Sequence, residues 1–208
     1  MAIEYDRRLL APLREVVQGY DNVEILAEDV LRVDLQSLFG GKTYRVVANI
    51  PYQITSMLLR RFLDQGPAPD RLVLTIQREV AQRVTSAPGE MSLLALSVQM
   101  YGVPTVVGHI AAGAFLPPPD VDSDILRVDV HPQPIVPPDK AATIFLLARA
   151  GFHQRRKKLR NALAAGLQLA PADVERRLAA AGIDPAARAE SLSLDEWKRL
   201  AESWGVRP

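Results

Sequence analysis

The sequence contains no cysteine, and its 208 residues include only three histidines, His109, His131 and His153. The lack of cysteine excludes disulfide bonds and thiolate-bound zinc, and the spacing of the histidines fits no metal site. No apolar run is long enough to span a membrane, and the first residues lack the pattern of a signal peptide. We therefore expect a cytoplasmic protein without a metal. The net charge of +1 does not by itself imply an anionic partner.

The composition is that of a folded α/β protein. Hydrophobic residues make up 48% of the sequence and charged residues 24%, which is enough apolar material for a substantial core. Along the first part of the chain, short apolar runs alternate with segments of helical periodicity. This alternation predicts a parallel, doubly wound sheet. The expected strands are 23–27, 44–48 and 71–76, and the expected helices are 7–17, 53–63 and 78–84.

The second half of the chain changes character at a proline-rich segment. Before it, residues 91–101 predict a buried helix, and 105–110 and 125–131 predict strands. The last strand alternates apolar and polar residues, which favours an edge strand with one hydrated face. Four prolines within 132–138 mark a domain boundary, so we predict domains at 1–133 and 134–208, the second all-α. Its expected helices are 140–151, 156–165, 171–181 and one that begins at the capping box Ser193 to Glu196.

The tetrapeptide Asn49-Ile50-Pro51-Tyr52 follows an apolar strand, at the end where open α/β sheets bind ligands. The Asn49 side-chain oxygen and the Ile50 carbonyl can accept the two hydrogens of an aromatic amine. Pro51 fixes the direction of that carbonyl, and Tyr52 can stack on an extruded base. The tetrapeptide therefore predicts a site that grips a flipped base and stabilises positive charge on its amine. The alternative is a strand-to-helix turn in which Asn49 is a cap and Pro51 occupies the first turn.

Two acids follow the first two apolar segments. Glu4 and Asp29 are about twenty-five residues apart, which is the spacing of a nucleotide site. An acid at Glu4 can accept hydrogen bonds from both ribose hydroxyls, and Asp29 can accept from an adenine amine. Alternatively, Glu4 is a solvated acid beside Arg7 or Arg8, and Asp29 caps a turn.

Phe115 opens a stiff Phe-Leu-Pro-Pro-Pro segment at the tip of a hairpin-like excursion. There it can form the second face of a base sandwich with Tyr52. A rigid loop whose Phe115 packs inward explains the local sequence equally well.

A basic segment lies within the predicted helical domain, where residues 155–160 hold five cations. Like charges at this density repel one another unless an anion is near, so the segment predicts contact with RNA phosphates. The alternative is a solvated helix face. The cations are Arg155, Arg156, Lys157, Lys158 and Arg160, and Gln77, Arg78 and Arg83 can extend the same surface.

Taken together, these segments resemble the ribosomal RNA adenine dimethyltransferase family, and they occur in the family's order from end to end of the chain. The Asn-Ile-Pro-Tyr form differs from the Asn-Pro-Pro-Tyr of DNA adenine and glutamine methyltransferases. The matching segments are 2–6, 28–31, 49–52, 77–83, 115–123, 152–161 and 188–193.

The resemblance implies a class I, Rossmann-like methyltransferase sheet followed by a small helical domain. It implies dimethylation of N6 on two adjacent adenines in the 3′-terminal hairpin of small-subunit ribosomal RNA, within the immature 30S subunit, as part of ribosome biogenesis. The implied methyl donor is S-adenosylmethionine. By motif position, Glu4, Asp29, Val30 and Asn49 would bind this cofactor, and the tetrapeptide with Phe115 would act on the adenine.

The sequence departs from the family at its start. The family begins earlier, with an RNA-contacting arm and a strand that ends in a glycine-rich loop against the methionine part of the cofactor. Met1 falls inside what would be the second strand, so we expect an incomplete sheet, exposed apolar surface and weakened cofactor binding. A non-catalytic RNA-binding assembly factor is therefore a second hypothesis. A resistance-type methylase of large-subunit RNA is a third, which the Phe-x-Pro-Pro-Pro segment disfavours.

Overall fold

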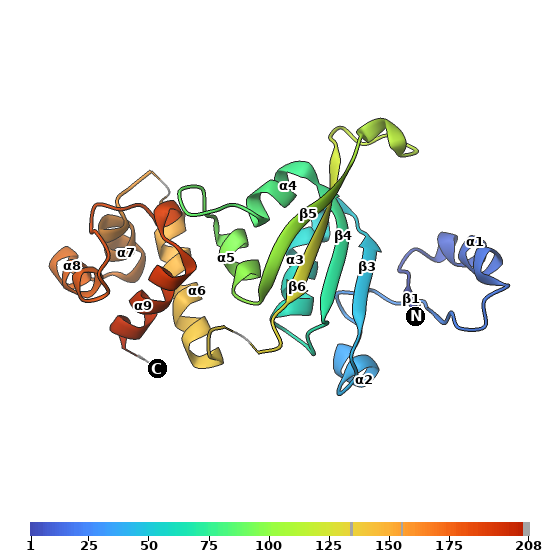
Figure 1. The fold of residues 1–208 in the computed structure, drawn as a ribbon, viewed down its shortest axis with the longest axis horizontal. Coiled ribbons are helices and arrows are strands. Elements are labelled where there is room, and N and C mark those ends of the chain that lie inside the picture. The colour runs from blue at the N-terminus through green and yellow to red at the C-terminus, as the bar shows by residue number, and fades with distance from the viewer. Residues whose placement is uncertain (134, 155, 206–208) are drawn as a thin grey trace.

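The computed structural model describes residues 1–133, 135–154 and 156–205. Its centre is a four-stranded mixed sheet with the strand order β3-β4-β6-β5 (Figure 1). β3 and β4 are parallel, and β6 runs antiparallel to both of its neighbours. The strands are β3 (Arg45–Asn49), β4 (Arg71–Gln77), β5 (Gly102–Ile110) and β6 (Ser123–Val130).

One face of this sheet is covered by helices because alternate strand residues are apolar. Leu72, Leu74 and Ile76 of β4 are fully buried against Leu59 and Phe62 of α3, and we call the surrounding cluster the sheet core. Burial of each such side chain contributes roughly 1.5–3 kcal/mol. The other elements of this part are α2 (Leu35–Phe39), η1 (Tyr52–Ile54), α3 (Thr55–Leu63), α4 (Arg78–Val84), α5 (Leu93–Gln99) and η2 (Ala112–Ala114).

A second, smaller sheet stands beside β3. It consists of β1 (Ala2–Ile3) and β2 (Ile25–Leu26), which are parallel and connected through α1 (Arg7–Val17) (Figure 1). The apolar face expected for α1 is largely solvated, since only Leu10 is buried while Leu9 and Val16 are 51% and 74% exposed. Among the described residues, no strand pairs with β3 on the side that faces the small sheet, because β1 and β2 pair only with each other.

The C-terminal part is a bundle of helices around its own core. Trp197 is fully buried there, and we call the cluster around it the helical core. α5 contributes to both clusters, with Leu96 in the helical core and Val98 in the sheet core. The predicted capping box at Ser193 and Glu196 is confirmed. The elements are α6 (Pro138–His153), α7 (Leu159–Leu167), α8 (Pro171–Ala180), η3 (Ala189–Ser191) and α9 (Leu194–Trp204).

Three expectations about the sheet and helices need correction. The sheet is not wholly parallel, and β6 is an interior strand between β4 and β5 rather than an edge. Its polar face is real, but it is satisfied by ion pairs of Asp129 with Arg71 and Arg127 at 2.5 and 2.9 Å. The helix expected from residue 156 begins at Leu159. The segment 30–39 contains the short helix α2, which Asp34 caps.

Candidate active site

A cleft of about 1140 Å³ lies between the small sheet and the free side of β3. Residues 1–6, 28–31 and 44–54 form most of its walls, and the β5–β6 connection also contributes. The structure thus brings every residue predicted for cofactor or base binding to one cavity. These residues are Glu4, Asp29, Val30, Asn49, Ile50, Pro51, Tyr52 and Phe115.

The tetrapeptide makes the turn from β3 into η1. Asn49 is the last residue of β3, in register with Thr75, and its side chain is exposed. Ile50 is 7% exposed and packs into the sheet core, which anchors the turn from below. Pro51 occupies the cap position of η1 without a side-chain cap hydrogen bond, so Asn49 does not serve as the cap that the alternative interpretation required. The amide is left at the cleft wall.

Tyr52 is held at both its ends. Its carbonyl accepts a hydrogen bond from Thr55 Oγ1 at 3.1 Å, and its hydroxyl lies 2.7 Å from Ser123 Oγ on β6. Ser123 is fully buried. These two hydrogen bonds hold Tyr52 between the start of α3 and the start of β6, where it lines the cleft.

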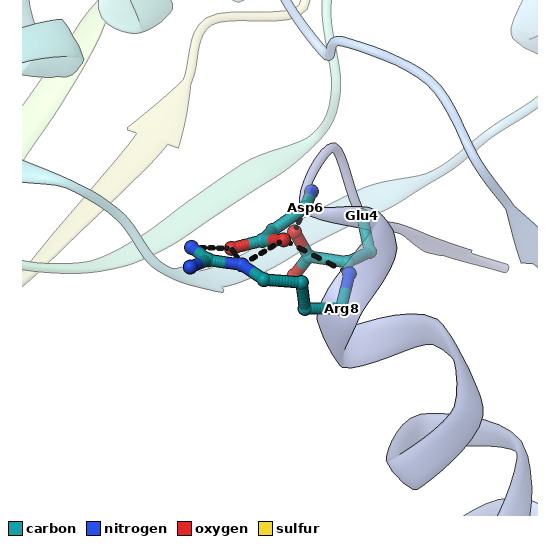
Figure 2. A network of polar contacts seen from close by, with 3 residues as sticks. All are labelled: Glu4, Asp6 and Arg8. Carbon is teal, nitrogen blue, oxygen red and sulfur yellow. Dashed lines mark hydrogen bonds and ion pairs between the residues drawn. The ribbon is translucent and has the colours of Figure 1, made fainter.

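Glu4 lines the cleft and belongs to a small polar network (Figure 2). Its Oε1 accepts a hydrogen bond of 2.6 Å from the Asp6 N–H. Asp6, rather than Glu4, pairs with Arg8, through contacts of 2.6–3.1 Å that include the backbone N–H of Arg8. These hydrogen bonds from Arg8 lower the pKa of Asp6 to about 2. The network orients Glu4 through Oε1 and leaves Oε2 available to a ligand.

Asp29 follows β2 and both caps a turn and faces the cleft. Its Oδ1 accepts from the Leu31 N–H at 2.9 Å, and its carbonyl accepts from the N–H of Arg32 and of Val33. This turn is the structural role that the alternative interpretation assigned to Asp29. The turn also holds the carboxylate and the neighbouring Val30 at the cavity wall, so the two roles are compatible.

Phe115 reaches the cleft from the connection between β5 and β6. It directly follows η2 and is partly exposed, whereas the next residue, Leu116, is 98% exposed. Phe115 belongs to neither apolar core. The side chain lines the cavity rather than packing inward.

Sequence reasoning missed two features of the cleft. Phe39 and Tyr44 stack with ring centroids 4.2 Å apart and an interplanar angle of 9°, and both rings line the cavity. Two aromatic residues flanking the Gly-Gly turn at 40–41 were the available signal. The partner of Tyr52, Ser123, lies 71 residues away along the chain, and no local pattern announces such a contact.

The described part of the basic segment begins in the turn before α7 and continues into that helix. Arg155 falls outside the described residues. Arg156, Lys157 and Lys158 are exposed in the turn before α7, while Arg160 forms an ion pair of 3.0 Å with Glu175. Three of the predicted RNA contacts are thus solvated cations, and Arg160 already has an anionic partner.

The donor set of the cleft fits an adenosine-type cofactor. Glu4 and Asp29 supply carboxylates at two strand ends, and the Phe39–Tyr44 pair supplies aromatic surface. The volume exceeds the roughly 300–1,000 Å³ of ordinary ligand pockets, which leaves room for a base beside a cofactor. Within the described part of the chain, no cluster of three or more His, Asp or Glu side chains could hold a metal ion. No helix in that part combines the length and the apolar character needed to cross a membrane.

The family model described as ribosomal RNA adenine dimethylase matches residues 1–204. The chain belongs to this family. Its enzymes are methyltransferases that use S-adenosylmethionine. The resemblance noted from the motifs is thereby confirmed, and so is the Rossmann-like fold class.

Relatives and solved structures agree with this assignment. A ribosomal RNA small subunit methyltransferase A from Dehalococcoides mccartyi is 44% identical over all of this chain and 72% of its own length. The protein of the same name from Moorella thermoacetica is 38% identical over 98% of this chain and 74% of its own length.

Two solved structures have the same fold. The 23S rRNA methyltransferase ErmE is similar at a TM-score of 0.74 and 25% identity, covering 97% of this chain and 80% of its own. A dimethyladenosine transferase from Plasmodium falciparum reaches a TM-score of 0.78 at 22% identity, covering 95% and 78%, and it shows the fold alone.

Proposed function

We propose that this protein dimethylates N6 of two adjacent adenines in the 3′-terminal hairpin of small-subunit ribosomal RNA, in the cytoplasm, during maturation of the 30S subunit. The observation that carries the proposal is the convergence of Asn49, Tyr52 and Phe115 with Glu4 and Asp29 in one cleft. The names of the relatives at 38–44% identity support the choice of small-subunit RNA.

In the part of the cleft near the small sheet, Glu4 would hold the cofactor through its ribose hydroxyls, since Asp6 engages only its Oε1. Asp29 and Val30 would hold the adenine ring from the turn after β2. When bound, S-adenosylmethionine supplies an electrophilic methyl group on a sulfonium centre.

The target base enters beside Asn49. The Asn49 side-chain oxygen and the Ile50 carbonyl accept the two N6 hydrogens, which turns the nitrogen lone pair toward the methyl donor. Tyr52 and Phe115 stack on the two faces of the base. As N6 bonds to the methyl carbon, the carbon–sulfur bond of the donor would break, and positive charge would develop on N6 until one of its protons leaves to solvent. The two acceptors would therefore stabilise the transition state more than the ground state.

The helical part, for which we propose residues 134–208 as a separate domain, binds the RNA backbone. The start of α7 is tied to the segment before η3, because the Leu159 N–H donates to the Ala187 carbonyl at 2.7 Å. η3 in turn contacts the catalytic part, because the Glu190 carbonyl accepts hydrogen bonds from the N–H groups of Gly89 and Met91. Arg156, Lys157 and Lys158 contact phosphates there.

The decisive experiment is methylation of immature small subunits with isotopically labelled S-adenosylmethionine, followed by mass spectrometry of the RNA. We expect N6,N6-dimethyladenosine at two adjacent positions. Bare large-subunit RNA is the parallel substrate, because modification of that RNA alone would indicate the resistance-type activity of the ErmE class. RNA binding without methyl incorporation or cofactor binding, even in a chain extended upstream, would leave only the non-catalytic assembly factor.

A further inference from the structure

Ser123 is a buried hydroxyl at the start of an interior strand. Its backbone is in register with Gln77 of β4 on one side and Ile110 of β5 on the other, so its position is fixed from both sides. Its side chain is fully buried, and its Oγ lies 2.7 Å from the Tyr52 hydroxyl. A rigid part of the sheet thus holds the phenol end of Tyr52.

The residue before it, Asp122, anchors the loop that carries Phe115. Asp122 Oδ1 accepts a hydrogen bond of 3.0 Å from the Ala112 N–H, at the start of η2. Its carbonyl accepts from the Arg78 N–H at 3.1 Å. Phe115 follows Ala112 by three residues, so its loop is fixed one residue away from the point that fixes Tyr52.

His109 and Arg78 lie beside the Asp122 carboxylate. His109 on β5 lies between Asp124 of β6 and Asp122 just before that strand, with Nδ1 at 2.9 Å from Asp124 Oδ1 and Nε2 at 3.5 Å from Asp122 Oδ2. Arg78 Nη1 is 3.9 Å from the same oxygen of Asp122. The firm contact of Asp122 is therefore the hydrogen bond from the Ala112 N–H, and His109 and Arg78 lie around the carboxylate.

We propose that Asp122 and Ser123 are positioning residues that together set the separation and tilt of the two aromatic walls, Tyr52 and Phe115. The inference rests on the proposed function, since it assumes that these rings stack on the target base. A slot whose walls are anchored to two adjacent residues at the start of β6 is formed before the base arrives, so little ordering remains for the bound state. Neither Asp122 nor Ser123 touches the base; each acts through the residue it holds.

The test uses an RNA hairpin in which 2-aminopurine replaces the target adenine, bound to the full 208-residue chain. Fluorescence of this base reports its unstacking from RNA and its stacking on protein, without any methyl transfer. We compare Ser123→Ala, Tyr52→Phe and the double variant for hairpin affinity, 2-aminopurine signal at saturation and, with adenine restored, kcat and KM. Ser92→Ala is the matched control, because Ser92 is a nearly buried hydroxyl that caps α5 away from the cleft.

We expect each single variant to lower kcat, or the 2-aminopurine response, about three- to tenfold, which corresponds to one hydrogen bond. Affinity for the hairpin should change less than about twofold, because the phosphate contacts are untouched. The double variant should be no worse than either single variant, since both remove the same hydrogen bond. Asp122→Ala should lower the same signal through the loop, and its effect should add to that of Ser123→Ala.

Two different failures are separable. If the wild-type chain gives the 2-aminopurine response and Ser123→Ala leaves it intact, or if Ser123→Ala and Tyr52→Phe are additive, the positioning role is overturned while the base slot stands. If the wild-type chain binds the hairpin without any 2-aminopurine response, the base slot of the proposed function is absent and the inference falls with it.

Discussion

The Tyr101 hydroxyl donates a hydrogen bond of 2.7 Å to Asp64 Oδ1, joining the residue before β5 to the C-terminal cap of α3. Arg60 Nη2 lies 3.7 Å from the other oxygen of Asp64. Burial of the ring, and then the hydrogen bond to Asp64, raise the pKa of Tyr101. Burial likewise raises the pKa of Tyr44, to about 12, where its hydroxyl donates to the Pro67 carbonyl.

These two phenols predict a loss of stability at alkaline pH. Because the folded-state pKa of each is above the unfolded value of about 10, the stabilisation is fully present below that pH and is lost as the pH rises toward 12. The free energy of unfolding, measured with urea, should therefore fall less steeply with pH for Tyr44→Phe and Tyr101→Phe than for the wild type. Tyr20→Phe, at a ring 63% exposed, is the control for loss of one phenol. Parallel pH profiles for wild type and both variants would contradict the assignment.

The Asn49 amide should be needed for methyl transfer rather than for RNA binding. Loss of a preorganised acceptor at a charge-developing atom costs about 100-fold or more in kcat. We therefore expect Asn49→Ala to lower kcat by at least that factor while the dissociation constant for the RNA hairpin stays within about twofold. Gln18→Ala removes an exposed amide from the end of α1 and serves as the control. A kcat within tenfold of wild type for Asn49→Ala would remove Asn49 from the reaction.

The exposed cations of the basic turn should bind RNA in a salt-dependent manner. Alanine at both Lys157 and Lys158 should weaken hairpin binding and reduce the slope of log affinity against log salt by about 1 for each phosphate that is no longer neutralised. Arg160→Ala should have a smaller effect because Glu175 already neutralises that side chain. Arg176→Ala, which breaks a pair with Asp173 on α8, controls for net charge. An unchanged salt slope in the double variant would place the RNA elsewhere.

The free side of β3 should promote self-association. Val47 lies in the middle of this strand and is 80% exposed, and an unpaired apolar strand edge is a template for pairing with another chain. Sedimentation velocity should show concentration-dependent association that Val47→Lys suppresses. Val16 on α1 is 74% exposed and lies outside β3, so Val16→Lys is the control that separates strand pairing from general apolar contact. Equal suppression by both substitutions would argue against pairing through β3.

The packing of α6 against α7 should depend on Gly166. A Cβ at this position would meet Ala150 Cβ at 2.7 Å and Ala150 Cα at 3.0 Å, and backbone cannot move aside cheaply. We expect Gly166→Ala to lower the free energy of unfolding by about 1–3 kcal/mol, the usual cost of overpacking. Gly19→Ala is the control, since nothing lies within 4 Å of its added Cβ. Urea unfolding of the two variants measures the difference.

Local patterns predicted the elements and the composition of the cleft, because strand ends and turns are encoded over a few residues. Asn49, Tyr52, Glu4 and Asp29 could be selected in this way, and the structure places all of them along one cavity. Their roles stay predictions. The contact of Tyr52 with Ser123 could not be foreseen, because it depends on which strands become neighbours.

Pairing order also explains the error over β6. Alternating apolar and polar residues usually mean one hydrated face, and an edge position is the simplest way to obtain it. Here the polar face belongs to an interior strand, and Asp129 pairs with both Arg71 and Arg127 on it. Periodicity reports the environment of each face but not the number of neighbouring strands.

The placement of α5 has a mechanical consequence for the whole molecule. This short helix lies between the sheet and the C-terminal helices (Figure 1). It supplies Leu96 to the helical core around Trp197 and Val98 to the sheet core. Because α5 belongs to both clusters, unfolding of either cluster removes packing contacts from the other. Heating should therefore melt the two halves in a single cooperative transition, and RNA seated on one half should slow hydrogen exchange in the other.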